Sequence, residues 1–244
     1  MNDDAEARKA QMRAIFDRLA PEYDAAGPGC FAYFGRRLVQ EVGIEPGQRV
    51  LDVASGRGAV LFAAAEQVGP TGTVVGIDLA EGMVRATNDE ASRRGLGAPV
   101  RVMDAERLDF PEATFSRVLC GFGLMFFPHL DRALSEFRRV LEPGGRIGIS
   151  TWQVSQADDV RVVLDDLGLG GPGEPGWITD PDELVGLLKR AELSDVKVKL
   201  DSNTFRYADL DEYWQTARGT GQRRRLDVLK PEETERVRAA LADE

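Results

Sequence analysis

The chain alternates short apolar runs with longer segments of helical spacing, and this alternation limits its fold more than any other feature. Strands of a parallel sheet are short and rich in β-branched residues, because helices cover both faces of the sheet. Repeated strand-then-helix order predicts a doubly wound α/β sheet with right-handed crossovers. The predicted strands are Arg49 to Val53, Thr73 to Ile77, Val100 to Met103, Arg117 to Cys120 and Ile147 to Thr151.

Helical patterns lie between and before these runs. Residues 5–23 and 31–42 have amphipathic spacing and are separated by a Gly-Pro-Gly break. After His129, apolar side chains recur at steps of three and four residues as far as Leu141, which places them on one helical face. The Pro-Gly-Gly triplet at residues 143–145 then ends the pattern.

The remainder of the chain mixes a loop, a helix and one strand-like run. A Gly/Pro-rich loop spans residues 168–176, and a helix opened by Asp180 and Pro181 runs to about residue 191. Residues 196–207 resemble a long strand, and two more helical patterns follow. We therefore expect N-terminal helices or a lid at 1–47, a ligand-binding core at 48–152, and the sheet edge with cap helices at 153–244.

Composition excludes several classes of function. The net charge of −10 on 244 residues repels a nucleic-acid backbone. Membrane insertion is not expected, because no apolar run approaches the roughly 20 residues that span a bilayer. Two cysteines and a charged start without a signal-like apolar stretch predict a reducing, cytoplasmic setting. The sequence predicts no metal site and leaves oligomeric state open, with a homodimer among the possibilities.

A glycine-containing turn follows the first predicted strand. Asp52 lies in the strand end, and Gly56 and Gly58 let backbone N–H groups approach a ligand closely. Tight packing without a ligand is the alternative explanation. A dinucleotide fingerprint needs a third small residue at position 61, which is leucine, so the pattern fails for NAD there.

Two acids end the next two predicted strands. Asp78 is suited to accept hydrogen bonds from ribose hydroxyls, or alternatively to cap the helix that begins near Glu81. Asp104 is suited to accept from an exocyclic amine, or is simply an exposed loop acid. The carboxyl ends of neighbouring parallel strands are where ligands of open α/β sheets bind, so the two acids and the glycine turn support one another.

The order of four motifs resembles class I S-adenosylmethionine-dependent methyltransferases. The motifs are VLDVASGRGAV, VVGIDLAEGMV, RVMDAERLDF and FSRVLCGFGLMFFPHLDRALSEFRRVLEPGGRIGIST. Within the class, the chain is similar to the small-molecule branch that includes ubiquinone/menaquinone-biosynthesis enzymes, and its FDRLAPEYDA segment resembles that branch's N-terminal helix. This resemblance implies a Rossmann-like methyltransferase core with S-adenosylmethionine as cofactor.

The resemblance also implies roles for individual residues. Asp52 would hold the cofactor's ammonium group, and Tyr23 would close over the cofactor. Asp78 would bind the ribose, while Asp104 and Ala105 would contact the adenine edge. The remaining implied contacts are Ala54, Ser55, Gly56, Gly58, Cys120 and Gly121 around the methionine part, and Leu79 and Met83 against the adenine.

The chain departs from the family pattern at two places. Ala54 stands where the loop commonly has its first glycine, which tightens the turn. The family's sheet ends in an antiparallel hairpin, but only its first strand is evident, at residues 196–207. The final antiparallel strand is therefore expected to be missing, either from this protein or because the chain is a shortened piece.

The acceptor side carries one histidine and several aromatic residues. His129 borders the expected acceptor pocket and is the only candidate imidazole base, although a capping role at the helix start is an alternative. Aromatic residues that could line an apolar pocket are Tyr33, Phe122, Phe126, Phe127 and Trp177, with core packing as the alternative. The sequence thus predicts methyl transfer to a small organic acceptor, aromatic or polyketide-like, by O- or C-methylation in cofactor or secondary-metabolite biosynthesis. Cofactor binding with a non-methylating step such as cyclisation, or an NAD(P)-dependent reductase, are the alternatives.

Overall fold

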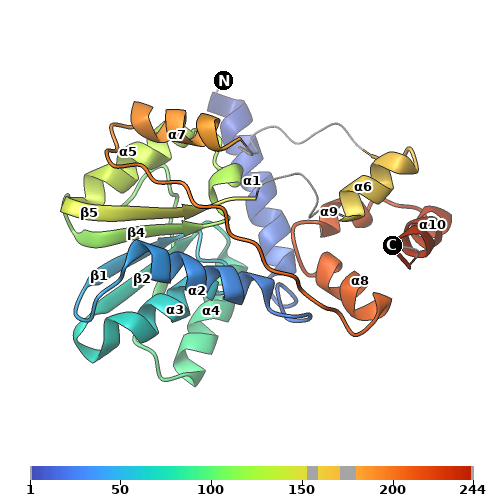
Figure 1. The fold of residues 1–244 in the computed structure, drawn as a ribbon, viewed down its shortest axis with the longest axis horizontal. Helices are drawn as coiled ribbons and strands as arrows, with labels where there is room; N and C mark the ends of the chain where they lie inside the picture. The colour runs from blue at the N-terminus through green and yellow to red at the C-terminus, as the bar shows by residue number, and fades with distance from the viewer. Residues whose placement is uncertain (1, 153–158, 171–179, 243–244) are drawn as a thin grey trace.

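A five-stranded parallel sheet forms the centre of the computed structural model, which describes residues 2–152, 159–170 and 180–242 (Figure 1). The strand order is β3-β2-β1-β4-β5, and each pairing between neighbours is parallel. The doubly wound class predicted from the alternating pattern is confirmed. The strands are β1 (Arg49–Val53), β2 (Thr73–Asp78), β3 (Val100–Val102), β4 (Phe115–Gly121) and β5 (Leu141–Ser150).

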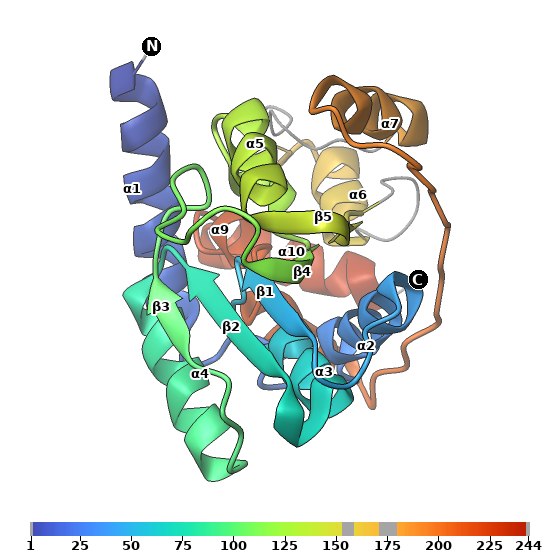
Figure 2. The same cartoon turned by 90° about the vertical axis from the view of Figure 1, so that its left-hand side faces the viewer.

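Helices cover both faces of this sheet (Figure 2). Helices α2 (Cys30–Val42), α3 (Ala59–Val68) and α4 (Glu81–Arg93) lie on one face, and α5 (Leu130–Val140) and α7 (Pro181–Arg190) on the other. Val50 packs with the first set and Leu51 with the second, and both side chains are fully buried. This two-sided burial is why β1 reads as a continuous apolar run rather than an alternating one.

The first helix and the C-terminal helices lie outside this sandwich. Helix α1 (Asn2–Leu19) packs beside α4, near the β3 edge (Figure 2). Helices α6 (Asp159–Asp166), α8 (Leu210–Arg218), α9 (Arg223–Leu226) and α10 (Pro231–Ala242) form a small cluster with its own apolar core. Two short 3₁₀ turns are η1 (Gly69–Thr71) and η2 (Leu124–Phe126). None of the helices in the described ranges combines the length and apolar character needed to cross a bilayer.

The C-terminal cluster contacts the link between α1 and α2. The backbone N–H of Asp24 donates to the carbonyl of Gly219, at 3.1 Å. Arg223 forms an ion pair with Glu22 at 2.9 Å. A Cβ on Gly219 would lie 2.9 Å from the Glu22 carbonyl, so this close contact requires glycine. The cluster thereby holds a segment that lines the cavity described below.

The prediction of a strand at residues 196–207 is wrong. Residues 196–207 run in extended form along α2 and belong to no strand. Asp201 accepts from Arg37 Nε at 2.7 Å, and the ring of Phe205 packs edge-on against Phe34. Side-chain contacts with a helix, rather than backbone pairing with β5, hold the segment, and Leu200 remains 65% exposed. The alternating sequence satisfied the strand pattern, but the side chains of this segment pack on α2 and, among the described strands, β5 pairs only with β4.

Candidate functional site

A cavity of about 500 Å³ opens at the carboxyl edge of the sheet, where β1, β2 and β3 end. The chain proceeds from β1 to β2 and β3 on one side, and then returns to β4 and β5 on the other. This reversal beside β1 creates the crevice in which ligands of open α/β sheets bind. Residues of α1 and of the α1–α2 link close the opposite wall.

The turn after β1 brings backbone N–H groups to this cavity. Gly56 and Gly58 have φ values of +52° and +85°, a region that favours glycine. Gly56 N donates to Asp78 Oδ2 at 2.9 Å, which ties the β1 turn to the end of β2. A Cβ on Gly56 would meet no protein atom within 4 Å, whereas one on Gly58 would lie 2.6 Å from the Phe62 ring. The space beside Gly56 is therefore open to a ligand.

Ala54 occupies the turn position at which the family resemblance implies a glycine. Its φ is +56°, so the methyl group sits on a strained backbone. A Cβ on Gly123, after β4, would lie only 2.6 Å from the Cβ of Ala54. The missing side chain at Gly123 thus makes room for the methyl group of Ala54, and the β1 and β4 turns touch.

Asp52 is a buried acid without a partner. Asp52 is only 1% exposed, and neither of its carboxyl oxygens has a hydrogen-bond partner in the described structure. The Ser55 hydroxyl donates instead to the main-chain carbonyl of Asp52, at 2.9 Å. Burial, together with the nearby charge of Asp78, raises the pKa of Asp52 to about 8. An unpaired buried acid that lines a cavity is suited to a cationic ligand group.

Asp78 is held rigidly at the end of β2. Its two carboxyl oxygens accept from Gly56 N and Ala80 N, each at 2.9 Å. Burial raises the pKa of Asp78, and these N–H groups oppose the rise. A carboxylate oxygen has a second lone pair, so the bonds that fix Asp78 leave capacity for hydroxyl donors in the cavity.

Asp104, after β3, is engaged by a lysine from α1. Lys9 Nζ lies 2.7 Å from Asp104 Oδ2 and 2.6 Å from Glu106 Oε2. Burial alone would lower the pKa of Lys9, but the bonds to the two acids raise it overall. Ala105 lies between the two acids and also lines the cavity. The reading of Asp104 as a simply exposed loop acid does not fit this arrangement.

Aromatic rings line the side of the cavity toward α2. Tyr23 stacks on Phe31 with ring centroids 5.5 Å apart, and Phe31 contacts Phe122 edge-on at 5.7 Å. Phe122 in turn stacks on Trp152 at 4.2 Å, although its backbone has a strained φ of +55°. Phe16 and Phe126 continue the apolar wall at 5.0 Å from each other. This wall can exclude water from a flat organic molecule.

Most residues predicted for the site surround this one cavity, although ligand contact itself stays a prediction. The cavity-lining ones are Tyr23, Asp52, Ala54, Ser55, Gly56, Gly58, Asp78, Leu79, Met83, Asp104, Ala105, Gly121, Phe122, Phe126 and Phe127.

Four predicted residues are not among those that line it. Cys120 is fully buried in β4, where burial raises the pKa of its thiol to about 12. His129 precedes α5, and its ring Nε2 is buried without a hydrogen-bond partner. Its backbone N–H donates to Glu106 Oε1 at 2.8 Å. Tyr33 packs against Phe34 and Phe205. Trp177 lies outside the described residues.

Several cavity-lining residues were not predicted from the sequence, and two contributions stand out among them. One is the face of α1 formed by Lys9, Met12, Arg13 and Phe16. Their spacing of three and four residues is a helical-face signal, but two of the four are charged and so hide it. The other is Asp24, which also lines the cavity. Burial raises the pKa of Asp24 to about 6, and the positive charge of Arg57 opposes this rise.

Comparison with known proteins identifies the family. A family model described as a methyltransferase domain matches residues 50–145. Nocamycin O-methyltransferase of Saccharothrix syringae is 50% identical over 137 residues, which cover 56% of this chain and 49% of that protein. The chain therefore spans about half the length of that relative.

A second relative is matched over most of its length. The ubiquinone/menaquinone biosynthesis C-methyltransferase UbiE of Ralstonia pickettii is 34% identical over 183 residues, covering 70% of this chain and 75% of that protein. The crystal structure of an S-adenosylmethionine-dependent methyltransferase from Aquifex aeolicus shares the fold, with TM-score 0.55, 24% identity, and coverage of 64% and 78% of the two chains. The chain belongs to the family of S-adenosylmethionine-dependent methyltransferases.

Proposed function

We propose that the protein transfers a methyl group from S-adenosylmethionine to a small organic acceptor in a biosynthetic pathway. Family membership supports the reaction class, and the names of the relatives include both O- and C-methyltransferases. The aromatic wall around Phe31 and Phe122 favours an aromatic or polyketide-like acceptor. Which atom receives the methyl group is left to experiment.

The unpaired carboxyl of Asp52 is the observation that carries this proposal. It lies in a cavity that also contains Asp78 and the open space beside Gly56. An adenosyl ligand with an amino-acid tail carries both an ammonium group for a buried acid and ribose hydroxyls for a second acid. The residues present therefore fit the family's cofactor.

The proposed contacts follow the strand ends. The β1 turn from Ala54 to Gly58 would pack against the methionine part, beside Gly121. Asp78 would accept from the ribose, with Leu79 and Met83 against the adenine. Asp104 and the N–H of Ala105 would contact the adenine edge, and Tyr23 would cover the cofactor.

When bound, the cofactor supplies a methyl group on positively charged sulfur, which is already activated for transfer. The chain's own contribution is then to align the acceptor and to exclude water, which the aromatic wall is placed to do. Among the residues that the structure describes, no histidine lines the cavity. Asp24, with a pKa of about 6, is the lining carboxylate suited to take a proton from an acceptor hydroxyl near neutral pH.

We propose a small molecule rather than a nucleic acid as the acceptor, because the net charge of −10 repels a phosphate backbone. A cytoplasmic setting and self-association remain predictions. Cell fractionation tests the first, and light scattering of the purified chain tests the second.

The experiment is a binding and turnover assay on the whole chain. Equilibrium dialysis with labelled S-adenosylmethionine and with NADH should show retention of the first alone. Incubation with a panel of phenols, hydroquinones and aromatic acids should then give a product heavier by one CH₂ equivalent. Retention without any methylated product across the panel would favour a non-methylating step such as cyclisation, and retention of NADH alone would favour a reductase. The Asp78→Ala protein serves as the control with a weakened site.

A further inference from the structure

One face of α1 forms a wall of the cavity, although half of the residues in this helix whose burial is described are solvent-exposed. Lys9, Met12, Arg13 and Phe16 lie on this face, at steps of three and four residues. Phe16 meets Phe126 at the aromatic end, and Lys9 meets Asp104 at the end where the third strand stops. Helix α1 thus spans the cavity between its two ends.

The two halves of α1 are held differently. Its C-terminal half packs into an apolar cluster that includes Leu19 and Met83, and Asp17 Oδ1 accepts from Gly82 N at 2.7 Å. Its N-terminal half buries Ala5 and otherwise contacts the protein through polar groups. Lys9 binds the two acids, and Arg8 Nη2 donates to the Met125 carbonyl at 3.4 Å.

Lys9 bridges two acids that would otherwise repel each other. Its side chain is 12% exposed, and that of Glu106 is 4% exposed, so these charges are screened weakly by water. Asp104 Oδ1 accepts from Glu106 N at 2.9 Å, and Glu106 Oε1 accepts from His129 N at 2.8 Å. Each acid is therefore oriented by a backbone N–H, with its other oxygen directed to the ammonium group.

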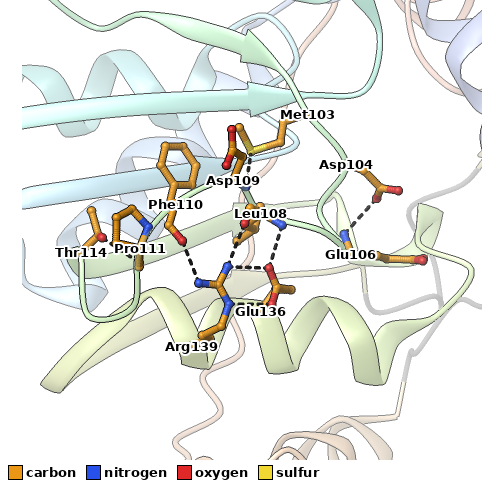
Figure 3. Close-up of polar contacts among 10 residues, drawn as sticks. All are labelled: Met103, Asp104, Glu106, Leu108, Asp109, Phe110, Pro111, Thr114, Glu136 and Arg139. Carbon is orange, nitrogen blue, oxygen red and sulfur yellow. Dashed lines mark hydrogen bonds and ion pairs between the residues drawn. The ribbon is translucent and has the colours of Figure 1, made fainter.

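The loop that carries both acids is fixed independently of Lys9 (Figure 3). Arg139 on α5 donates to the carbonyls of Leu108 and Phe110 at 2.8 and 2.7 Å. Glu136, paired with Arg139, accepts from Leu108 N at 2.7 Å. Because α5 holds this loop, loss of Lys9 would not unfold it. The loss would change the orientation of the two carboxylates and weaken the attachment of α1.

We propose that Lys9 is a specificity-determining residue that positions Asp104 to recognise the exocyclic amine of the adenine ring. This inference rests on the proposed function, since it assigns the adenine to this end of the cavity. Lys9 holds Asp104 in one orientation and leaves it a lone pair for an N–H donor. A nucleobase with a carbonyl at that position would place an acceptor against the carboxylate, which a site built for a donor rejects.

The test compares S-adenosylhomocysteine with S-inosylhomocysteine, in which a carbonyl replaces the amine, by calorimetry. We expect the wild type to prefer the adenine ligand by about tenfold or more, the scale of a charge-assisted hydrogen bond. Lys9→Met should lose most of this preference, and Lys9→Arg should retain it. Lys189→Met, at an exposed lysine on α7, is the matched control.

A second measurement does not depend on any ligand. Hydrogen exchange of amides in the first half of α1 should be faster in Lys9→Met than in the wild type and the Lys189→Met control. Glu106→Gln removes one of the three ion pairs that Lys9 forms, with Glu6, Asp104 and Glu106, and should give an intermediate result. Unchanged selectivity and unchanged exchange in Lys9→Met would overturn the role of Lys9. Failure of the wild type to bind either ligand would instead overturn the proposed function.

Discussion

Replacing Asp52 by Asn should remove a pH dependence of cofactor binding that the structure predicts for the wild type. The pKa of Asp52 is about 8 without a ligand cation beside it, because the side chain is buried near Asp78. Below that pH the group is mostly protonated and neutral. A ligand ammonium favours the ionised form, so binding lowers this pKa and releases the proton.

The size of the effect follows from that pKa. At pH 7, roughly 0.9 of a proton should leave for each ligand bound, and at pH 6 nearly one. The affinity for S-adenosylhomocysteine should therefore rise by almost tenfold per unit between pH 6 and 7 and level off above 8. The sign follows from the raised pKa, since a group with a lowered pKa would already be ionised in this range.

The assay is calorimetry at pH 6.0 to 8.0, repeated in buffers of different ionisation heat so that released protons are counted. Asp24, with a pKa of about 6, also titrates in this range, but it is present in both proteins. The difference between wild type and Asp52→Asn therefore isolates Asp52. Equal proton release in the two proteins at pH 7 would refute the argument that Asp52 binds the ligand's ammonium group.

Three other substitutions test separate parts of the site. Asp78→Ala should weaken S-adenosylhomocysteine binding by about 1.5 to 3 kcal/mol, the range for hydrogen bonds to a charged group, and unchanged calorimetric affinity would remove it from the ribose contact. Gly56→Val should abolish binding, because valine would occupy the open space beside a backbone with φ of +52°, and normal binding in dialysis would contradict this. His129→Ala should keep turnover within about threefold, because the side chain does not line the cavity. A loss of about 100-fold would restore His129 as the base.

The core of the fold was predictable because its signals are local. Buried parallel strands need apolar runs, and the five predicted strands agree with the structure to within a few residues, apart from a longer β5. The acids Asp52, Asp78 and Asp104 were predictable for the same reason, since each ends or follows one of those runs. Residues 196–207 show the limit of this approach. Alternation there satisfied the strand pattern, but the segment packs its side chains on α2 instead of pairing its backbone with the edge strand β5.

The other wall of the cavity depended on contacts between distant segments. The position of Lys9 against Asp104 joins residues 95 positions apart, and nothing in the composition of α1 predicts it. Likewise, His129 was the only candidate imidazole base in the sequence. At the start of α5, however, its backbone N–H donates to Glu106 and its side chain does not line the cavity.

The sequence alone therefore determined the parallel sheet, its glycine turn and the acids at its carboxyl edge. Each of these depends on the periodicity or spacing of neighbouring residues. Only the tertiary structure decided which helix covers the cavity, which acid lacks a partner, and how Gly123 makes room for the methyl group of Ala54. Those properties arise where segments far apart in the chain meet, and the periodicity of one segment does not say which distant segment it will contact.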